Sequence, residues 1–190
     1  MLGRNVAMKG LPYFTVGKVV KGFGRGSKDL GIPTEVVLSE LCETLKFEAL
    51  MEAVGARANF PDEVVNGLPE EIHTGVYYGW AKLDNGPVHK MVMSIGWNPY
   101  FRNVKKSMET HILNDFGTDF YGSQLKVCLT GYIRPEMDFR TLDDLISTIK
   151  HDIDTADRQL ETAAMKIFKD HSFFQPESKE DKIVNGDTSH

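Results

Sequence analysis

The stretch GVYYGWAKLDNGPVHKMVMSIGW, Gly75 to Trp97, decides the fold class of this 190-residue chain. Its two halves, residues 75–83 and 88–97, are rich in aromatic and β-branched residues, a composition typical of strands. Between them, Asp84-Asn85-Gly86-Pro87 places Asn-Gly at the turn, which is a strong hairpin signal. The stretch therefore predicts two antiparallel strands joined by a tight turn.

Further strand patterns lie on both sides of this hairpin. Phe14–Val20 precedes it, and Ser107–Leu113 and Gln124–Arg134 follow it. Thr141 then begins an amphipathic helix, because its hydroxyl can cap the first turn and apolar residues recur on one face as far as Leu160. Several closely spaced antiparallel strands followed by one helix predict a small closed β-barrel with the helix packed outside it.

The composition fits one soluble domain, since 41% of the residues are hydrophobic and no apolar run approaches the ~18 residues of a membrane span. The net charge of −5 and the lack of a basic stripe disfavour a nucleic-acid partner. Cys42 and Cys128 offer neither a disulfide framework nor metal-binding spacing, which fits a reducing compartment. We expect one domain over residues 11–175, a flexible tail over 176–190, a cytoplasmic location and no membrane span.

The first candidate site is the glycine-rich loop GFGRGSK, Gly22 to Lys28. Converging backbone amides bind phosphate, and glycine lets the backbone come close to it. Lys28 adds a positive charge. The spacing matches neither a P-loop nor a dinucleotide-binding fingerprint, and glycine-rich turns between strands are more often structural. The loop by itself leaves both interpretations open.

The second candidate is Glu109, within the strand-like stretch SMETHIL, Ser107 to Leu113. Strand alternation puts Glu109, His111 and Leu113 on one face and the residues between them on the other. A carboxylate in this setting is either a general base or the partner of a neighbouring cation, and the ion pair is the more common case. We interpret His111 as a hydrogen-bonded structural histidine, since no second metal ligand shares its spacing.

The third candidate is Arg134, within GYIRPE, Gly131 to Glu136, which leads on to Phe139. An arginine at the end of a strand, directly before a proline, is placed to reach a bound ligand. It is equally well placed to pair with Glu136. The sequence pattern leaves both roles open.

Together these motifs resemble the eukaryotic riboflavin kinase (flavokinase) family. The matching stretches run in order from about Leu11 to the C-terminal tail: GFGRGSKDLGIPT, GVYYGWA, MSIGWNPYF, KKSMETHIL, DFYG and GYIRPE. The resemblance implies a compact six-stranded antiparallel Greek-key barrel with a C-terminal helix. It also implies transfer of a phosphate from ATP to riboflavin, giving FMN, with Mg²⁺ (or Zn²⁺ or Mn²⁺) as the metal. Small-molecule substrates are the partners it implies.

The resemblance further implies site residues by position. Glu109 falls on the catalytic base. The nucleotide-binding positions are Gly22, Lys28, Thr34, Ile112, Asn114 and Tyr121. The flavin-binding positions are Arg134, Met137 and Phe139, and the metal-binding positions are Thr34 and Asn59. Asn114 and Met137 stand where the family would have histidine and lysine, and we expect modest effects on affinity.

One departure from the family pattern concerns its Pro-Thr-Ala-Asn motif, whose threonine and asparagine hold the metal and the nucleotide. Here Pro33-Thr34 and Ala58-Asn59 are separated by an extra segment, Glu35–Arg57. The composition of this insertion is typical of a helix, but its apolar residues lie on two opposite faces. The insertion therefore splits the metal-binding motif.

Three outcomes of this split are open. The insertion can loop out while Asn59 still reaches the metal beside Thr34, or Glu35 can serve as a substitute oxygen ligand. Alternatively Val36 takes the place of the asparagine, and Mg²⁺-ATP binding weakens because an oxygen ligand is lost. We expect impaired activity. The alternative function is accordingly a catalytically impaired, flavin-binding barrel that acts as an interaction module.

Overall fold

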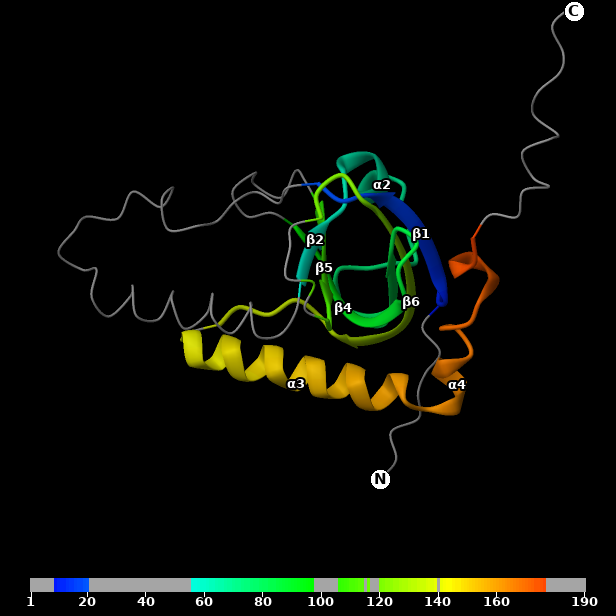
Figure 1. The fold of residues 1–190 in the computed structure, drawn as a ribbon. Coiled ribbons are helices and arrows are strands. Elements are labelled where there is room, and N and C mark those ends of the chain that lie inside the picture. Colours follow the sequence, from blue (N-terminus) through cyan, green and yellow to red (C-terminus); the bar gives the residue numbers. More distant parts are fainter. Residues whose placement is uncertain are drawn as a thin grey trace, which may run out of the picture.

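The computed structural model describes residues 9–20, 56–97, 106–114, 116, 120–139 and 141–176. Six strands form one antiparallel sheet in the spatial order β1-β6-β3-β4-β5-β2. Their bounds are β1 Tyr13–Lys18, β2 Ala56–Asn59, β3 Gly75–Leu83, β4 Val88–Trp97, β5 Lys106–Ile112 and β6 Gln124–Arg134. Figure 1 shows this sheet curled round its own interior. Among the described residues its two edges meet at an isolated bridge between Val20 and Asn59.

The helices follow the strands on the outside. They are α2 Asp62–Asn66, α3 Leu142–Leu160 and α4 Ala163–Lys166, with a 3₁₀ turn, η2, at Ser172–Phe174. Figure 1 shows α3 lying along one side of the curled sheet. The expected six-stranded antiparallel fold with a C-terminal helix is confirmed. No helix in the described ranges is long and apolar enough to cross a membrane.

The predicted hairpin between β3 and β4 is present, with Lys82 paired to Val88. The turn closes through a hydrogen bond from the Gly86 amide to the Leu83 carbonyl at 2.9 Å. Asp84 adopts the left-handed conformation, with φ of 48°. Its carboxylate also accepts a hydrogen bond from the backbone amide of Gln124 at 2.8 Å, which ties the turn to the start of β6. Asp84 tolerates this conformation because a short polar side chain can form such local bonds.

The sheet buries apolar side chains on both of its faces, which explains why GVYYGWA is a nearly continuous apolar run. One set fills the interior of the curled sheet and includes Tyr77, Met93 and Leu129. The other set, including Trp80, packs outside it against Leu160 of α3. Because alternate residues of a strand face opposite sides, one segment supplies both cores.

The predicted start of α3 is also correct. The Thr141 hydroxyl accepts a hydrogen bond from the Asp144 amide at 3.1 Å, and acidic residues occupy the first turn. Beyond α4 the chain packs back on the sheet, where Lys82 and Lys126 donate to the carbonyls of Phe174 and Phe173 at 2.6 and 3.0 Å. This contact fixes the far end of the helix. The insertion expected to be helical lies outside the described residues, except for its last two positions in β2.

Candidate active site

A cavity of about 310 Å³ lies between the outer face of the sheet and the part of α3 from Leu145 to Ile153. The sheet and the segment after β6 supply one wall: Val76, Val92, Ser94, Glu109, Thr110, His111, Arg134, Glu136, Met137 and Phe139. The helix supplies the other: Leu145, Ile149, Asp152 and Ile153. The candidate base and all three candidate flavin-binding residues therefore line one cavity.

Glu109 lies in a row of polar side chains that crosses three strands. It is paired with Ser94 on β4 and with Asn59 on β2. Residues directly opposite one another in an antiparallel sheet point to the same face, with their Cβ atoms ~5 Å apart. A hydroxyl, a carboxylate and an amide thus lie side by side. The expected alternation of β5 holds, because Met108, Thr110 and Ile112 are buried on the other face.

The Glu109 side chain is exposed. Ser107 donates a long hydrogen bond of 3.4 Å to its Oε1 atom. Within the part of the chain that the structure describes, no lysine or arginine forms an ion pair with it. The ion-pair alternative for Glu109 thus finds no support there. An accessible carboxylate at the mouth of a cavity is suited to accept a proton from a ligand.

Arg134 forms its ion pair with Asp152 of α3 rather than with Glu136. Its Nε atom donates to both Asp152 carboxylate oxygens at 3.0 Å, and Nη2 donates to one of them at 2.8 Å. Its guanidinium lies 5.7 Å from the centre of the Phe139 ring. Glu136 instead packs its carboxylate against Gly96, where any Cβ atom would collide with it.

The candidate nucleotide-binding residues are spread more widely. Ile112 is 1% exposed and points into the interior of the curled sheet. Asn114 lies just after β5, where its backbone N–H donates a hydrogen bond to the Ile112 carbonyl at 2.7 Å. Tyr121 is 53% exposed in the turn before β6. Gly22, Lys28 and Thr34 lie outside the described residues, so their roles stay predictions.

Two residues of the cavity were missed from the sequence, Ser94 and Asp152. The signal for Asp152 was present, because it stands within the apolar stripe of α3, one turn after Ile149 and one turn before Ala156. A carboxylate on an apolar helix face needs a partner. Alternation along β4 could likewise have placed Ser94 on the face opposite the buried Met93 and Ile95.

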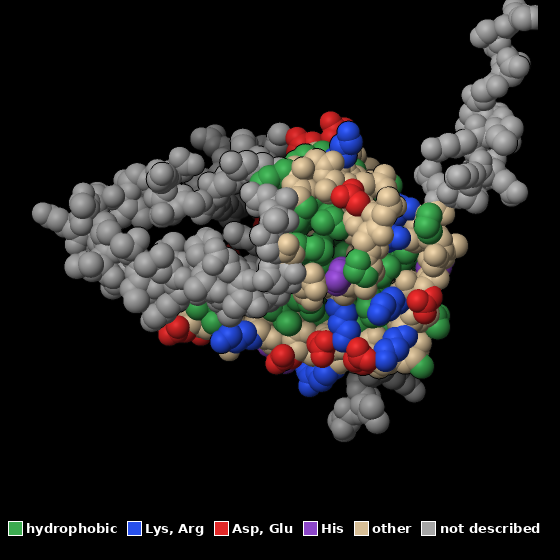
Figure 2. Space-filling model, in the orientation of Figure 1, with side chains coloured by type: hydrophobic (Ala, Val, Ile, Leu, Met, Phe, Trp, Pro, Cys, Tyr) green, Lys and Arg blue, Asp and Glu red, His purple; other side chains and the backbone are tan. Residues whose placement is uncertain are grey.

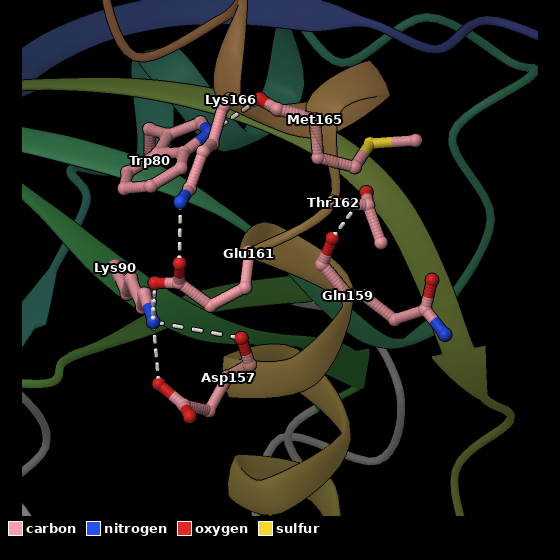
Figure 3. A network of polar contacts seen from close by, with 8 residues as sticks. All are labelled: Trp80, Lys90, Asp157, Gln159, Glu161, Thr162, Met165 and Lys166. Atoms are coloured by element: carbon pink, nitrogen blue, oxygen red, sulfur yellow. Dashed lines mark hydrogen bonds and ion pairs between the residues drawn. The ribbon is translucent and has the colours of Figure 1, made fainter.

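A second cavity, of about 520 Å³, lies at the other end of α3 and contains none of the candidate residues. Its wall carries an ion-pair network in which Lys90 contacts Asp157 at 2.6 Å and Glu161 at 2.5 Å (Figure 3). Lys166 contacts Glu161 at 2.6 Å. Burial opposes the charge of Lys90, but its two acidic partners outweigh that effect and raise its pKa. We interpret this network as an attachment of the helix.

Charged side chains of both signs alternate along the helix side of the molecule, as Figure 2 shows. Among the residues that the structure describes, no three His, Cys, Asp or Glu side chains gather in a way that could hold a metal. Cys128 is a free thiol whose pKa burial raises to about 12, so it is protonated near neutral pH.

The curled sheet and its helix-covered cavity, with convergent polar groups on an apolar wall, are typical of β-barrel-like proteins that bind small molecules. Residues 9–160 match the family model for riboflavin kinase, and the chain belongs to the riboflavin kinase family. It is 50% identical over 179 residues to the riboflavin kinases of Mus musculus and Homo sapiens, covering 94% of this chain and 99% of each of theirs.

A solved structure agrees with this assignment. The crystal structure of riboflavin kinase from Trypanosoma brucei superposes with a TM-score of 0.60 at 27% identity. The match covers 88% of this chain and 89% of that one. The resemblance inferred from the sequence motifs is therefore confirmed at the level of the family and of the fold.

Proposed function

We propose that this chain transfers the γ-phosphate of ATP to the 5′-hydroxyl of riboflavin, with Glu109 as the general base. The observation that carries the proposal is the shared cavity, in which Glu109 lies together with Arg134, Met137 and Phe139. Family membership supports the reaction. The cavity supports the assignment of these residues to it.

Phosphoryl transfer needs an oriented hydroxyl, a group that accepts its proton, and positive charge around the phosphates. Glu109 is accessible and free of a cation partner among the described residues, so it is available to accept the proton. As the hydroxyl oxygen bonds to the γ-phosphorus, the bond to the ADP oxygen breaks and the proton passes to the Glu109 carboxylate. Ser94, beside Glu109 in the register, can orient the hydroxyl.

The flavin ring is proposed to lie deeper in the cavity than the ribityl chain. Phe139 and the α3 side chains Ile149 and Ile153 give it an apolar wall. Met137, which is 52% exposed, stands at the rim and has the flexibility to adapt to a planar ligand. Arg134 adds hydrogen-bond donors. Such a site favours a large, mostly apolar ring with a few polar atoms.

Asn59 fits a role in holding Mg²⁺, because its amide oxygen is a hard ligand and its residue is paired directly with Glu109. We propose that Asn59 and Thr34 hold the metal, whose charge offsets that of the phosphates. We assign nucleotide binding to Gly22, Lys28, Asn114 and Tyr121, and also to Ile112. Ile112 would act through its backbone, since its side chain is buried in the interior.

The register of β2 supports weakened metal binding in this form of the protein. Arg57 occupies the strand position opposite His111, two residues before Asn59. Deleting Glu35–Arg57 would join Thr34 to Ala58 and put the threonine at that position. The insertion thus leaves an arginine where the uninterrupted motif would have threonine. This favours the expectation of impaired Mg²⁺-ATP binding, while Asn59 keeps its place beside Glu109.

The deciding experiment is riboflavin turnover with Mg²⁺-ATP, followed by chromatography of FMN. Glu109→Gln should lower kcat by about 10²- to 10⁴-fold, the usual range for a general base. Glu70→Gln, an exposed and remote acid, serves as the matched control and should leave kcat unchanged. Full activity in Glu109→Gln would remove the base from the proposal. No FMN from either the intact chain or the Glu35–Arg57 deletion would remove the kinase assignment.

The second candidate, an impaired flavin-binding barrel, is favoured only by the Arg57 register. Titrating the fluorescence of riboflavin separates it from the kinase, because quenching reports binding without turnover. Binding without FMN in the intact chain, together with FMN from the deletion variant, would establish the impaired form. Equal magnesium dependence of the two proteins would exclude it.

A further inference from the structure

Arg134 is held on three sides by groups of the protein itself. Asp152 accepts from its Nε and Nη2 atoms at 2.8–3.0 Å, and the Pro135 carbonyl accepts from Nη1 at 3.0 Å. The Phe139 ring lies 5.7 Å from the centre of the guanidinium. A long side chain that would otherwise sample many rotamers is thereby fixed in one orientation.

The partner that fixes it is a buried charge. The Asp152 residue is only 3% exposed, and it stands on α3 between the apolar side chains Ile149 and Ile153. Buried ion pairs add little net stability compared with apolar side chains of similar volume, because both charges lose their hydration. Stability alone is thus a weak reason for a carboxylate here. Its place on the cavity wall indicates a reason connected with the ligand.

The geometry leaves Arg134 with unused donors. A guanidinium carries five N–H groups. The bonds to Asp152 and Pro135 occupy Nε–H and one N–H on each terminal nitrogen. Among the residues that the structure describes, one N–H on Nη1 and one on Nη2 therefore have no partner. Such N–H donors suit carbonyl oxygens on the edge of a planar ring, which riboflavin carries and ATP lacks.

We propose that Asp152 is a positioning residue for riboflavin, which acts by holding the Arg134 guanidinium against Phe139 in the orientation that the flavin ring requires. The proposal rests on the proposed function for the identity of the ligand. Asp152 does not touch the flavin in this scheme. Its effect reaches the ligand through Arg134, so a change at Asp152 should alter flavin binding and leave nucleotide binding unchanged.

The test compares Asp152→Asn with Asp157→Asn, a matched change on the same helix that affects the exposed Lys90 contact instead. We expect Asp152→Asn to raise the KM for riboflavin, and its Kd by fluorescence quenching, about tenfold, because a misoriented contact weakens binding strongly. The KM for ATP should change by less than about twofold. Asp157→Asn should move neither constant. An unchanged riboflavin Kd in Asp152→Asn, or a parallel rise in both KM values, would overturn the proposal.

A double-mutant cycle distinguishes positioning from a purely structural effect. In an Arg134→Met background, Asp152→Asn should cause no further loss of riboflavin affinity, since the group that it positions is gone. An undiminished effect in that background would contradict the proposal.

Two further arms keep the test decisive. If Asp152→Asn does not fold, Arg134→Lys answers the same question, because lysine keeps the charge for Asp152 but lacks the planar fork. Unchanged riboflavin affinity in Arg134→Lys would overturn the proposal. Failure of the kinase assignment is separate, since it would appear as absent FMN in both the intact chain and the Glu35–Arg57 deletion, while the fluorescence titration still reports on Asp152.

Discussion

Helix α3 is attached to the sheet by charged side chains at two places, but the two attachments differ in kind. Near its middle, the buried carboxylate of Asp152 binds Arg134 of β6 on the cavity wall. Near its end, Lys90 of β4 binds Asp157 and Glu161, whose side chains are 58% and 52% exposed. The two cations are similarly shielded, at 18% exposure for Arg134 and 21% for Lys90, so the attachments differ in their carboxylates, which are buried in the first and open to solvent in the second.

The difference shows where this fold needs an exact orientation. A buried pair is rigid because no water competes with it, and removing one partner leaves an unpaired charge. An exposed pair is screened by water and salt and contributes little. At its far end α3 is held mainly by apolar contacts, including Leu160 and Ala156 packed near Trp80. The fold therefore places its rigid ion pair at the cavity and leaves its weak ones elsewhere.

The largest effect that would sharpen this comparison is expected from Asp152→Ala. It should lower the free energy of unfolding by about 3–5 kcal/mol, since Arg134 would stay partly buried without a partner. Urea unfolding measures the change. The double variant Arg134→Met with Asp152→Leu should regain most of it. A loss below ~1 kcal/mol in the single variant would mean that water compensates the arginine and that this attachment is no more rigid than the other.

A somewhat smaller effect is expected from Leu160→Ala at the far end. The side chain is fully buried, so its truncation should cost about 3 kcal/mol through lost packing and the cavity that remains. The same urea titration measures it, and riboflavin affinity should not change. If Leu160→Ala costs less than the removal of Lys90, the far end is held by charge rather than by packing, and the comparison fails.

Lys90→Met should cost only about 0.5–1 kcal/mol although it removes two ion pairs. Removing Lys90 leaves its acidic partners Asp157 and Glu161 in contact with water. Removing Asp152, in contrast, leaves Arg134 partly buried without its partner. The cost should shrink further in 0.5 M NaCl, where the screening length is below ~10 Å. A salt-independent cost of several kcal/mol would show that this network is as desolvated as the buried pair.

The smallest effect concerns pH. Hydrogen bonds from Lys166 and Lys90 lower the pKa of Glu161 from its ordinary value of 4.5 to about 2. A carboxylate with a lowered pKa in the folded state stabilises it above its unfolded pKa, and this contribution disappears as the pH falls through the folded pKa. The Tm difference between the intact chain and Glu161→Gln should thus be constant near neutral pH and vanish between pH 4.5 and 2.

Glu70→Gln provides the control for this pH series, because it carries the same substitution at an exposed site outside the network. The contribution of Lys90 to stability has the opposite pH dependence, because its pKa is raised in the folded state. This contribution is complete below the ordinary lysine value of 10.5 and is lost as the pH rises above it. A Tm difference for Glu161→Gln that persists unchanged at pH 2 would contradict the assignment of the ion pairs.

The elements that could be predicted from sequence are those with local signals. The β3–β4 hairpin follows from Asn-Gly and its flanking patterns, and the start of α3 follows from Thr141 and Asp144. Strand β2 and helix α2 were not predicted, because 4 and 5 residues are too few to establish a period.

Part of the lining of the cavity was predictable, because Glu109 and the candidate flavin-binding residues came from a family resemblance and share that cavity. The partner of Arg134 was not predictable. Asp152 is 18 residues away along the chain, and its contact depends on where α3 crosses β6. Crossing positions are set by packing of the whole helix on the sheet, which no local pattern encodes. A carboxylate on an apolar stripe was the one available clue.

The bridge between Val20 and Asn59 has a consequence for how this protein family can vary. The Val20 amide donates to the Asn59 carbonyl at 3.0 Å, so the chain leaves and re-enters the sheet at neighbouring points. Lengthening the segment between two adjacent anchors changes its closure entropy only logarithmically. Evolution, or an engineer adding a reporter, can therefore insert new sequence there and keep the sheet, provided that the inserted segment still returns to the sheet beside Val20.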